Sequence, residues 1–337
     1  RNFSTRYTMK AISLDLGGSH VTIAIVEDDT ILLSQEISVD PGAELLPLLP
    51  RFKAIVYDML ATLNISVEDC VGVAMGCAAM VDRTSGRVLS TNGKFEDSPS
   101  IDLPAWSLKD FGLPFALEND ARMALLGEWY AGAAKGADDV VMITLGTGIG
   151  GAAMAGGKVY RTRQVQGGCL GGHIPALFTG RKCTCGGFGC MEAEASGWAL
   201  PLIAREWPGF EQSRLATLDR INFRALFELA REGDPVALGV RDRCLHVWAV
   251  GTVGLIHAYG PELVVFGGGV MRSGDIILPY IRDYAGKYSW TPSGPVRILP
   301  AALGNHAGLL GAIPSLTDPG ATPAATAGSA RQHAHTP

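Results

Sequence analysis

Short apolar segments bounded by turn-forming residues mark the first part of the chain. Segments 10–16, 20–27 and 30–37 are rich in β-branched and other apolar residues. Gly17-Gly18 joins the first pair, and Asp28-Asp29 joins the second. Glycine and aspartate pairs between apolar runs are typical of tight turns. We therefore predict three short strands joined by tight turns.

Further apolar segments predict strands, two of which end in glycine-rich loops. These strands are expected over about 71–75, 140–145, 152–155 and 263–266. The strand at 140–145 runs into the loop GTGIGG, and the last strand ends in Gly267-Gly268-Gly269.

Longer segments predict helices over about 42–63, 119–133, 234–259 and 307–316. The first is amphipathic. Asn119 or Asp120 suits the start of the second, because short polar side chains accept hydrogen bonds from the free amides of a first turn. Strands and helices together predict an α/β fold.

Two strand–glycine–strand segments have the same design. DLGG at 15–18 and GTGIGG at 146–151 both turn a hairpin whose glycines expose backbone N–H groups, and such groups can cradle phosphate oxygens. Their recurrence in two halves predicts two related lobes with a cleft between them. Each loop alone is equally compatible with an ordinary glycine-rich hairpin. GTGIGG is a poor dinucleotide fingerprint, because a strand rather than a helix is expected after it.

Composition narrows the class of protein. The 337 residues suffice for about two domains, and 47% hydrophobic with 18% charged residues are typical of a globular chain. The 43 glycines fall in clusters, which favours ligand-cradling turns over a fibrous repeat. A net charge of −5 and a pI near 5.8, without a basic stripe, argue against a nucleic-acid partner.

No segment predicts a membrane span or a membrane partner. The longest apolar run, Val247–Ile256, contains two glycines and is far shorter than the roughly 20 residues of a spanning helix. Residues 1–9 are expected to be an N-terminal extension. In one interpretation Met9 is the native start and the first eight residues lie upstream of it, and in the alternative the segment is a short transit peptide. Residues 317–337, rich in Ala, Thr, Pro and Gly, predict a disordered tail.

Seven cysteines, three of them clustered, favour a reducing cytoplasm over a disulfide framework.

Histidine and cysteine gather in the stretch GGHIPALFTGRKCTCGGFGC. His173, Cys183, Cys185 and Cys190 have the number and chemistry of a closed, tetrahedral, structural Zn²⁺ site. Cys183 and Cys185 are one residue apart, a spacing that suits two ligands on one turn and suits a disulfide poorly. Glycines between the cysteines let the chain fold back. The alternative is a set of buried free thiols.

A series of short motifs follows in a fixed order along residues 11–316. They are DLGGSH at 15–20, VDRTSGRV at 81–88, ENDA at 118–121, GTGIGG at 146–151, GH at 172–173, CTCGGFGCMEAEASG at 183–197, VVFGGGV at 264–270 and ALGNHAGLLGA at 302–312. In this order they resemble the motifs of the ROK family, which comprises sugar kinases and related repressors.

The resemblance implies a two-lobed actin-like (ribonuclease H-like) ATPase fold whose interlobe active-site cleft binds sugar and ATP. The small lobe is then expected at 10–118 with a returning helix at 304–316. The large lobe with the zinc-binding loop is expected at 119–303. The implied activity is ATP-dependent phosphorylation of a hexose or hexose derivative, with Mg²⁺ as the working ion and a homodimer as the assembly.

The resemblance also assigns roles to single residues. Asp120 matches the catalytic base, and Asn119, Asp120, His173 and Glu192 match sugar-binding positions. The first phosphate loop of the family matches Asp15, Gly17 and Gly18. The second phosphate loop matches Gly146, Thr147 and Gly148. The glycines beside the adenosine match Gly267, Gly268 and Gly269.

The chemistry of two of these residues supports their roles. Phosphoryl transfer needs positioning and charge neutralisation, and a carboxylate aimed at the attacking hydroxyl takes its proton. Asp120 stands at a strand-to-helix junction. Without the surrounding motifs, a plain helix-start residue would be the favoured interpretation. A metal occupies only one nitrogen of His173, so the other can orient toward a sugar hydroxyl.

The chain departs from the family pattern at three places. Leu170 stands where the family has a glutamate three residues before the zinc histidine. Ala78 and Ala79 replace the usual Pro-Gly, and His20 replaces a lysine or asparagine. The first two changes fall on sugar-contacting segments, so they put the identity of the sugar in doubt more than the reaction.

Two other functions stay open from the sequence. A sugar-responsive regulator of the same family would carry an N-terminal helix-turn-helix, whereas about ten residues precede the first predicted strand. A non-catalytic sugar-binding protein would tolerate Leu170, but Asp15, Asp120 and both phosphate loops are retained.

Overall fold

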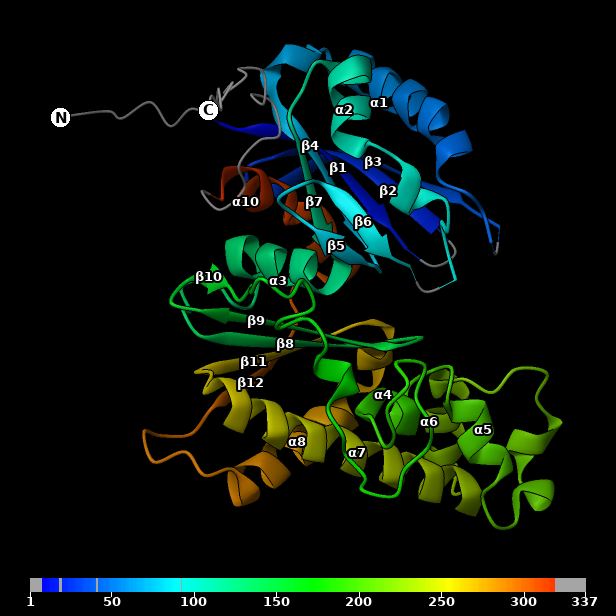
Figure 1. Ribbon diagram of the computed structural model, residues 1–337. Coiled ribbons are helices and arrows are strands. Elements are labelled where there is room, and N and C mark those ends of the chain that lie inside the picture. Colours follow the sequence, from blue (N-terminus) through cyan, green and yellow to red (C-terminus); the bar gives the residue numbers. More distant parts are fainter. Residues whose placement is uncertain (1–7, 18–19, 41, 92, 319–337) are drawn as a thin grey trace, which may run out of the picture. The chain divides into compact units, whose positions relative to one another are not determined.

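The chain divides into two compact units in the computed structural model, which describes residues 8–17, 20–40, 42–91 and 93–318 (Figure 1). Unit 1 holds the residues up to 126 and those from 308 onward, and unit 2 holds residues 127–307. The first boundary between the two units, after residue 126, lies inside α3 (Asp120–Ala131). The lobe boundaries expected at 118/119 and 303/304 stay predictions.

Unit 1 is built on a five-stranded sheet in the order β3-β2-β1-β4-β7. Its strands are β1 (Lys10–Leu16), β2 (His20–Glu27), β3 (Thr30–Ser38), β4 (Cys70–Cys77) and β7 (Phe115–Asn119). The first three are antiparallel neighbours, as their short connections require, whereas β4 and β7 run parallel to β1. The three strands predicted before residue 38 are confirmed.

Helices cover both faces of this sheet (Figure 1). They are α1 (Leu49–Leu63) and α2 (Leu103–Phe111) on one face and α10 (Ala312–Thr317) on the other. α10 packs on β4, where Gly72 leaves room for the side chain of Leu316. A hairpin of β5 (Met80–Asp82) and β6 (Arg87–Ser90) contacts β7 through β5.

Unit 2 repeats the strand pattern of unit 1 in the order β10-β9-β8-β11-β12. Its strands are β8 (Val140–Leu145), β9 (Ile149–Ala155), β10 (Lys158–Val159), β11 (Leu263–Gly267) and β12 (Arg297–Pro300). Strands β8, β9 and β10 are antiparallel neighbours, and β11 and β12 continue the sheet in parallel to β8. In both sheets the hairpin that begins with the central strand carries a predicted glycine loop, as two related lobes require.

The helices of unit 2 include α4 (Met191–Ala195), α5 (Leu200–Arg205), α6 (Phe223–Arg231), α7 (Pro235–Tyr259) and α8 (Gly274–Tyr288). The short helix α9 (Ala307–Leu310) begins at the last residue of unit 2 and continues into unit 1. The long helix α7 confirms the prediction over 234–259. Asp234 caps it by accepting hydrogen bonds from the amides of Val236 and Ala237, each 3.0 Å long. Gly260 ends it in the left-handed conformation, with φ at 58°.

Some predicted bounds shift for local reasons. The helix expected from 42 begins at Leu49, because Pro50 is tolerated only in a first turn. The strand after GTGIGG begins at Ile149, inside the motif. The helix expected over 307–316 is broken at Gly311, where a Cβ would lie 2.2 Å from a backbone oxygen of α3.

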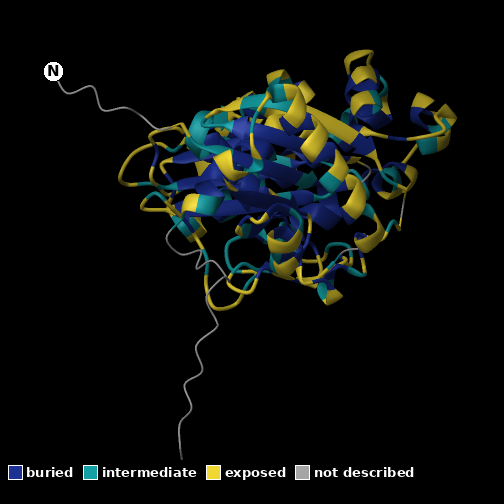
Figure 2. Ribbon diagram, turned by 90° about the horizontal axis from the view of Figure 1, so that it is seen from above, coloured by how far each residue is buried: buried dark blue, intermediate teal, exposed yellow. Residues whose placement is uncertain are grey.

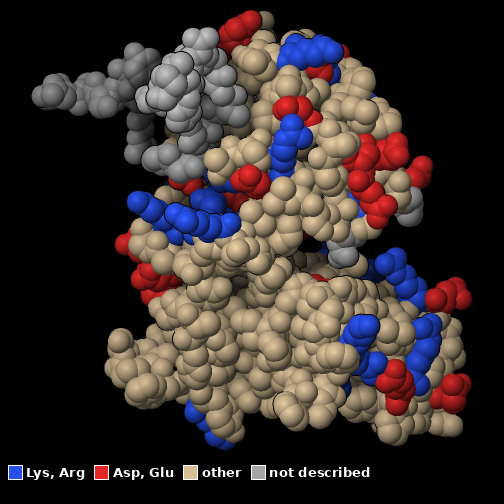
Figure 3. Space-filling view, viewed as in Figure 1, with Lys and Arg blue, Asp and Glu red and all other residues tan. Residues whose placement is uncertain are grey.

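Burial follows the sheets (Figure 2). The strands of both central hairpins are mostly buried, whereas exposed residues lie on the outer sides of helices, in loops and on the strands β3 and β6. Acidic and basic side chains are interspersed on the face shown in Figure 3. Among the described residues, no helix combines the length and the apolar character needed to cross a membrane.

Candidate active site and metal centre

Parallel strands bring several predicted site residues of unit 1 to one edge of its sheet. Asp15 on β1 pairs with Gly76 on β4, and Gly76 pairs with Glu118 on β7. Asn119 ends β7, and Asp120 begins α3. Because parallel strands end at the same sheet edge, Asp15 and Asp120 lie close enough for their charges to interact.

The Asp120 carboxylate is exposed to solvent yet held in place. Its Oδ1 accepts hydrogen bonds from the Ala121 amide at 2.8 Å and from Nδ2 of Asn119 at 3.0 Å. Desolvation by the surrounding protein raises the pKa of this carboxyl, and the two hydrogen bonds oppose the rise. A raised pKa makes the ionised carboxylate a better proton acceptor.

Asn119 is buried, and the structure engages both ends of its amide. Oδ1 accepts a hydrogen bond from the Ala121 amide at 3.1 Å, at the start of α3. Nδ2 donates to the Ala79 carbonyl oxygen at 3.3 Å and to Asp120. The expected helix start at Asn119 or Asp120 is therefore confirmed. The sugar contact of Asn119 stays a prediction, and it would share an amide that already has these partners.

Asp15 is half-buried, with its neighbours packed tightly around it. Burial, and then the nearby Asp120 carboxylate, raise the pKa of Asp15 to about 7. A Cβ at Gly308 would lie 3.0 Å from Asp15 Oδ2, so this glycine lets the backbone approach the carboxylate. Gly17 follows β1 in the β1–β2 turn, and the predicted loop residue Gly18 lies outside the described residues.

Glu118 is fully buried, and its sequence motif predicted no role for it. Its Oε2 lies 3.4 Å from Arg83 Nη1, and its Oε1 lies 3.5 Å from Arg122 Nη1. Oε1 also accepts a hydrogen bond from the Asn119 amide at 3.0 Å, and Arg83 donates to Ser315 Oγ at 3.0 Å. The network ties the strand end before Asp120 to α3 and to α10. The ENDA motif contained Glu118, but nothing in the sequence indicated its partners.

In unit 2, the second predicted phosphate loop connects β8 to β9. The Gly146 amide donates to the Gly148 carbonyl oxygen at 3.0 Å, which closes a tight turn. Within the described part of the chain, the amides of Thr147 and Gly148 donate no hydrogen bond. These two N–H groups are available to an anion.

The glycines at the end of β11 pack against the same loop region. Gly268 has a φ of 89°, and a Cβ there would lie 2.3 Å from the Leu145 carbonyl oxygen. Only glycine fits such a position. Gly267 pairs with Thr144 on β8, so the Gly267-Gly268-Gly269 segment lies beside the start of the β8–β9 loop.

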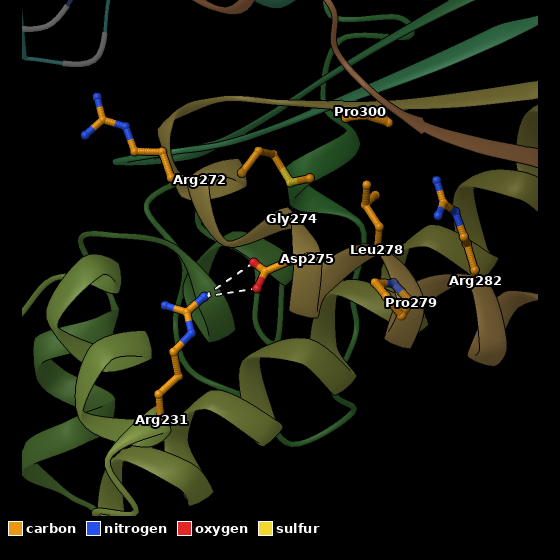
Figure 4. A pocket seen from close by; sticks show the side chains of 9 residues that line it. Arg231, Arg272, Gly274, Asp275, Leu278, Pro279, Arg282 and Pro300 are labelled. Carbon is orange, nitrogen blue, oxygen red and sulfur yellow. Dashed lines mark hydrogen bonds and ion pairs between the residues drawn. The ribbon is translucent and has the colours of Figure 1, made fainter.

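A pocket of about 700 Å³ follows these glycines in unit 2 (Figure 4). Met271, Arg272 and Leu278, which come after Gly269 in the chain, contribute to its lining. Arg231 at the end of α6 points toward Asp275 of α8 across the pocket, and their charged atoms lie 3.2 Å apart. Neither α6, nor α8, nor this pocket was predicted from the sequence.

The four predicted metal ligands come together in unit 2. One ligand atom from each of His173, Cys183, Cys185 and Cys190 lies within 4.8 Å of every other. Cys183 Sγ is 3.4 Å from His173 Nδ1, and Cys185 Sγ is 3.6 Å from Cys190 Sγ. Ligand atoms of a tetrahedral zinc site with Zn–S bonds of about 2.3 Å lie roughly 3.5–3.8 Å apart. The donor set and its spacing therefore fit Zn²⁺, and a disulfide would need sulfurs at about 2.05 Å.

His173 and Leu170 share one short turn. The His173 amide donates to the Leu170 carbonyl oxygen at 2.9 Å within a 3₁₀ turn at Gly171–His173. Because Nδ1 of His173 faces the cysteines, Nε2 is the nitrogen left for another partner. Leu170 is half-buried at the start of this turn and offers no polar atom in its side chain.

Glu192 is buried, with 8% of its surface exposed, and contacts the second glycine loop. Its Oε2 accepts a hydrogen bond from the Ile149 amide at 2.8 Å, and its Oε1 accepts one from Trp198 Nε1 at 3.3 Å. A Cβ at Gly148 would lie 2.7 Å from Oε2. The sugar contact assigned to Glu192 by resemblance stays a prediction.

Comparison with known proteins agrees with these motifs. The family model of the ROK family matches residues 11–317. The glucokinase of Thermotoga maritima is 33% identical over 90% of this chain and 96% of its own length.

Two crystal structures are similar to this chain. One is a ROK family glucokinase from Streptomyces griseus in complex with glucose and AMPPNP, with 30% identity, a TM-score of 0.71, and coverage of 90% of this chain and 97% of that one. The other is the ROK hexokinase from Thermus thermophilus, with 29% identity, a TM-score of 0.75, and coverage of 91% and 97%. These neighbours have the two-lobed actin-like ATPase fold that the family resemblance implied. The family match covers almost all of the described residues, and this chain belongs to the ROK family.

Proposed function

We propose that this chain transfers a phosphoryl group from ATP to a hydroxyl group of a hexose or hexose derivative, with Asp120 as the general base. The activity class, ATP-dependent sugar phosphorylation, follows from the family and from its glucokinase relatives. The residue roles are our proposal. They rest chiefly on the Asp120 carboxylate, which is solvent-exposed, anchored through Oδ1 and adjacent to Asp15.

The anchoring of Asp120 suits proton transfer. Both hydrogen bonds that hold the carboxylate go to Oδ1, so Oδ2 can accept the proton of the attacking hydroxyl. The buried Glu118–Arg83–Arg122 network fixes the backbone just before the base. Positioning of this kind is the main protein contribution to phosphoryl transfer.

Asp15 is the residue that would hold a magnesium ion, which neutralises charge on the phosphates when it is bound. Two neighbouring carboxylates with raised pKa values, Asp15 and Asp120, form a negative site that a hard cation would relieve. We assign the amides of Thr147 and Gly148 to the phosphate oxygens of ATP. We place the adenosine beside Gly267-Gly268-Gly269, next to the pocket of Figure 4.

The metal cluster would hold Zn²⁺ in a structural role. Four protein ligands complete a tetrahedron and leave no position for a catalytic water. The metal side of His173 is Nδ1, so Nε2 can donate to or accept from a sugar hydroxyl.

Replacing Asp120 by asparagine tests the general base. Asp120→Asn keeps the shape of the side chain but removes the proton acceptor, so kcat should fall at least about 100-fold while substrate binding survives. The measurement is steady-state kinetics in a coupled ADP-release assay. Asp58→Asn, on the exposed side of α1, is the control and should retain its rate. Near-normal turnover of Asp120→Asn would rule out the assignment.

The raised pKa of Asp15 predicts a pH-dependent stability. Because the folded pKa of Asp15, about 7, lies above the ordinary aspartate value of 3.8, the ionised form opposes folding. Stability is therefore lost as pH rises from about 4 to about 7. Asp15→Asn removes this effect, so it should stabilise the free protein by roughly 4 kcal/mol at pH 8 and by much less at pH 4. Urea unfolding at both pH values, without Mg²⁺, measures the difference. An equal shift at the two pH values would contradict the assigned cause.

The metal proposal predicts one zinc per chain. Cys185→Ser should lose the metal, lower the unfolding temperature, and weaken sugar binding through the turn that carries His173. Elemental analysis and thermal unfolding provide the readouts. Cys169→Ser changes a cysteine in the same region that lies outside the cluster, and it should retain zinc. Full activity of the parent protein without zinc would refute the proposal.

Leu170 predicts that glucose is not the best substrate. Losing a hydrogen bond to a charged acceptor costs about 1.5–3 kcal/mol, which corresponds to roughly 10- to 150-fold in kcat/KM. A deoxy, N-acetylated or epimeric sugar that lacks a hydroxyl facing Leu170 should therefore be preferred. Comparing kcat/KM over a panel of sugars, for the parent and for Leu170→Glu, provides the test. The prediction fails if glucose is best by a wide margin, or if the glutamate variant gains nothing on glucose.

A further inference from the structure

Glu192 joins the metal cluster to the β8–β9 glycine loop. Glu192 lies two residues after the predicted metal ligand Cys190, inside the short helix α4. Its carboxylate accepts hydrogen bonds from the Ile149 amide and from Trp198 Nε1. The Ile149 amide belongs to the loop end of β9, so this carboxylate holds the loop on the side of the metal cluster.

The chain after Glu192 makes further bonds to the same loop. The Gly197 amide donates to the Gly146 carbonyl oxygen, and the Trp198 amide donates to the Thr147 carbonyl oxygen, both at 2.9 Å. A Cβ at Gly197 would lie 2.8 Å from the Gly146 oxygen, so the glycine permits this approach. The three successive peptide groups between Gly146 and Ile149 are therefore each held from one segment, 192–198.

The turn that carries His173 packs on the loop from a second direction. A Cβ at Gly172 would lie 1.8 Å from the Ile149 carbonyl oxygen, and one at Gly171 would lie 3.1 Å from the Gly151 Cα. The Ile149 peptide is thus enclosed by the residues on either side of the metal-ligand sequence. Residues next to the metal ligands therefore contact the loop from two directions, so a metal that orders these ligands also orders the loop.

We infer that Glu192 is a positioning residue for the phosphate loop of ATP, and that the metal-binding segment controls nucleotide affinity even in the absence of sugar. The inference rests on the proposed function in one respect, namely that the Gly146–Gly148 loop binds ATP. It differs from the sugar-contact role, because a residue that only contacts sugar leaves nucleotide binding unchanged.

The physical reason lies in the two amides that face no acceptor. Thr147 and Gly148 donate no hydrogen bond within the described part of the chain, and they bind phosphate only if both point the same way. Glu192 holds the peptide group between Gly148 and Ile149, and the Trp198 amide holds the peptide group between Thr147 and Gly148. Without the carboxylate, the buried Ile149 amide loses its acceptor and the turn has no reason to keep this geometry.

The experiment measures the affinity of a non-hydrolysable ATP analogue with Mg²⁺, by calorimetry and without sugar. Glu192→Ala should weaken this affinity at least about tenfold. Glu192→Gln keeps one acceptor oxygen and should recover part of the loss. Trp198→Phe removes only the indole donor and should give a smaller loss in the same direction.

Glu194→Ala is the matched control. Glu194 is a second buried glutamate of α4, but its carboxylate pairs with Arg243 and the Arg181 amide, not with the glycine loop. Its removal should lower the unfolding temperature and leave the analogue affinity within about twofold. Zinc content, measured for every variant, separates loss of the metal from loss of the Glu192 hydrogen bonds.

The outcomes are distinct. Weaker analogue binding in Glu192→Ala with zinc retained supports the inference, and so does a graded loss in Glu192→Gln and Trp198→Phe if the alanine variant does not fold. Unchanged analogue binding in all three, with a raised KM for sugar, assigns Glu192 to the sugar alone and overturns the inference. A chain that binds the analogue but phosphorylates no sugar contradicts the proposed function, while the same affinity comparison still decides the role of Glu192.

Discussion

At several points in the candidate site, backbone or carboxylate oxygens occupy the space where a side chain would begin. The Leu145 carbonyl lies against Gly268, the Ile149 carbonyl lies against Gly172, and the Asp15 carboxylate lies against Gly308. A Cβ added to any of these glycines would lie at or below the shortest distance that a real Cβ tolerates from its neighbour, so each approach depends on glycine. Loops that must approach a ligand with their amides are held here by other backbone segments, and side chains would push these segments apart.

Negative charge is treated in two different ways in unit 1. The buried Glu118 carboxylate lies between two guanidinium groups, those of Arg83 and Arg122. Breaking one partner of such a buried pair leaves an uncompensated charge and is strongly destabilising. Asp15 and Asp120 stand next to each other instead, and the pKa of each is raised. The fold thus neutralises the structural carboxylate itself and leaves the two that would take part in chemistry to be stabilised by a cation or a proton.

The sequence predicted local features well, because their causes are local. The metal ligands were found from residue type and spacing, and they do come together. The start of α3 and the hairpins around both glycine loops were found from capping and turn residues. The helix α8 was missed because Gly274 begins it and Pro279 lies inside it, and both residues argue against a helix in a sequence.

What the sequence could not supply was the choice of partners across long separations. Asn119 and Glu192 were both expected at the sugar, since the family motifs place them there. In the structure, Asn119 caps α3, and Glu192 bonds to an amide that is 43 positions away in the chain. The sugar contacts of Asn119 and Glu192 stay predictions. The observed hydrogen bonds show that a residue in a functional motif can serve the framework of the site, a role no spacing rule would reveal.

Helix α4 illustrates why such a framework needs several anchors at once. It has only five residues, and a helix that short is not stable in water by itself. The metal ligand Cys190 stands at its N-cap, Glu192 reaches the glycine loop, and Glu194 pairs with Arg243 on α7. The metal ligand and the Glu192 hydrogen bonds restrain the same few backbone angles, so ordering by one lowers the entropy cost of the other. The metal cluster is in this way connected to the β8–β9 glycine loop as well as to the turn that carries His173.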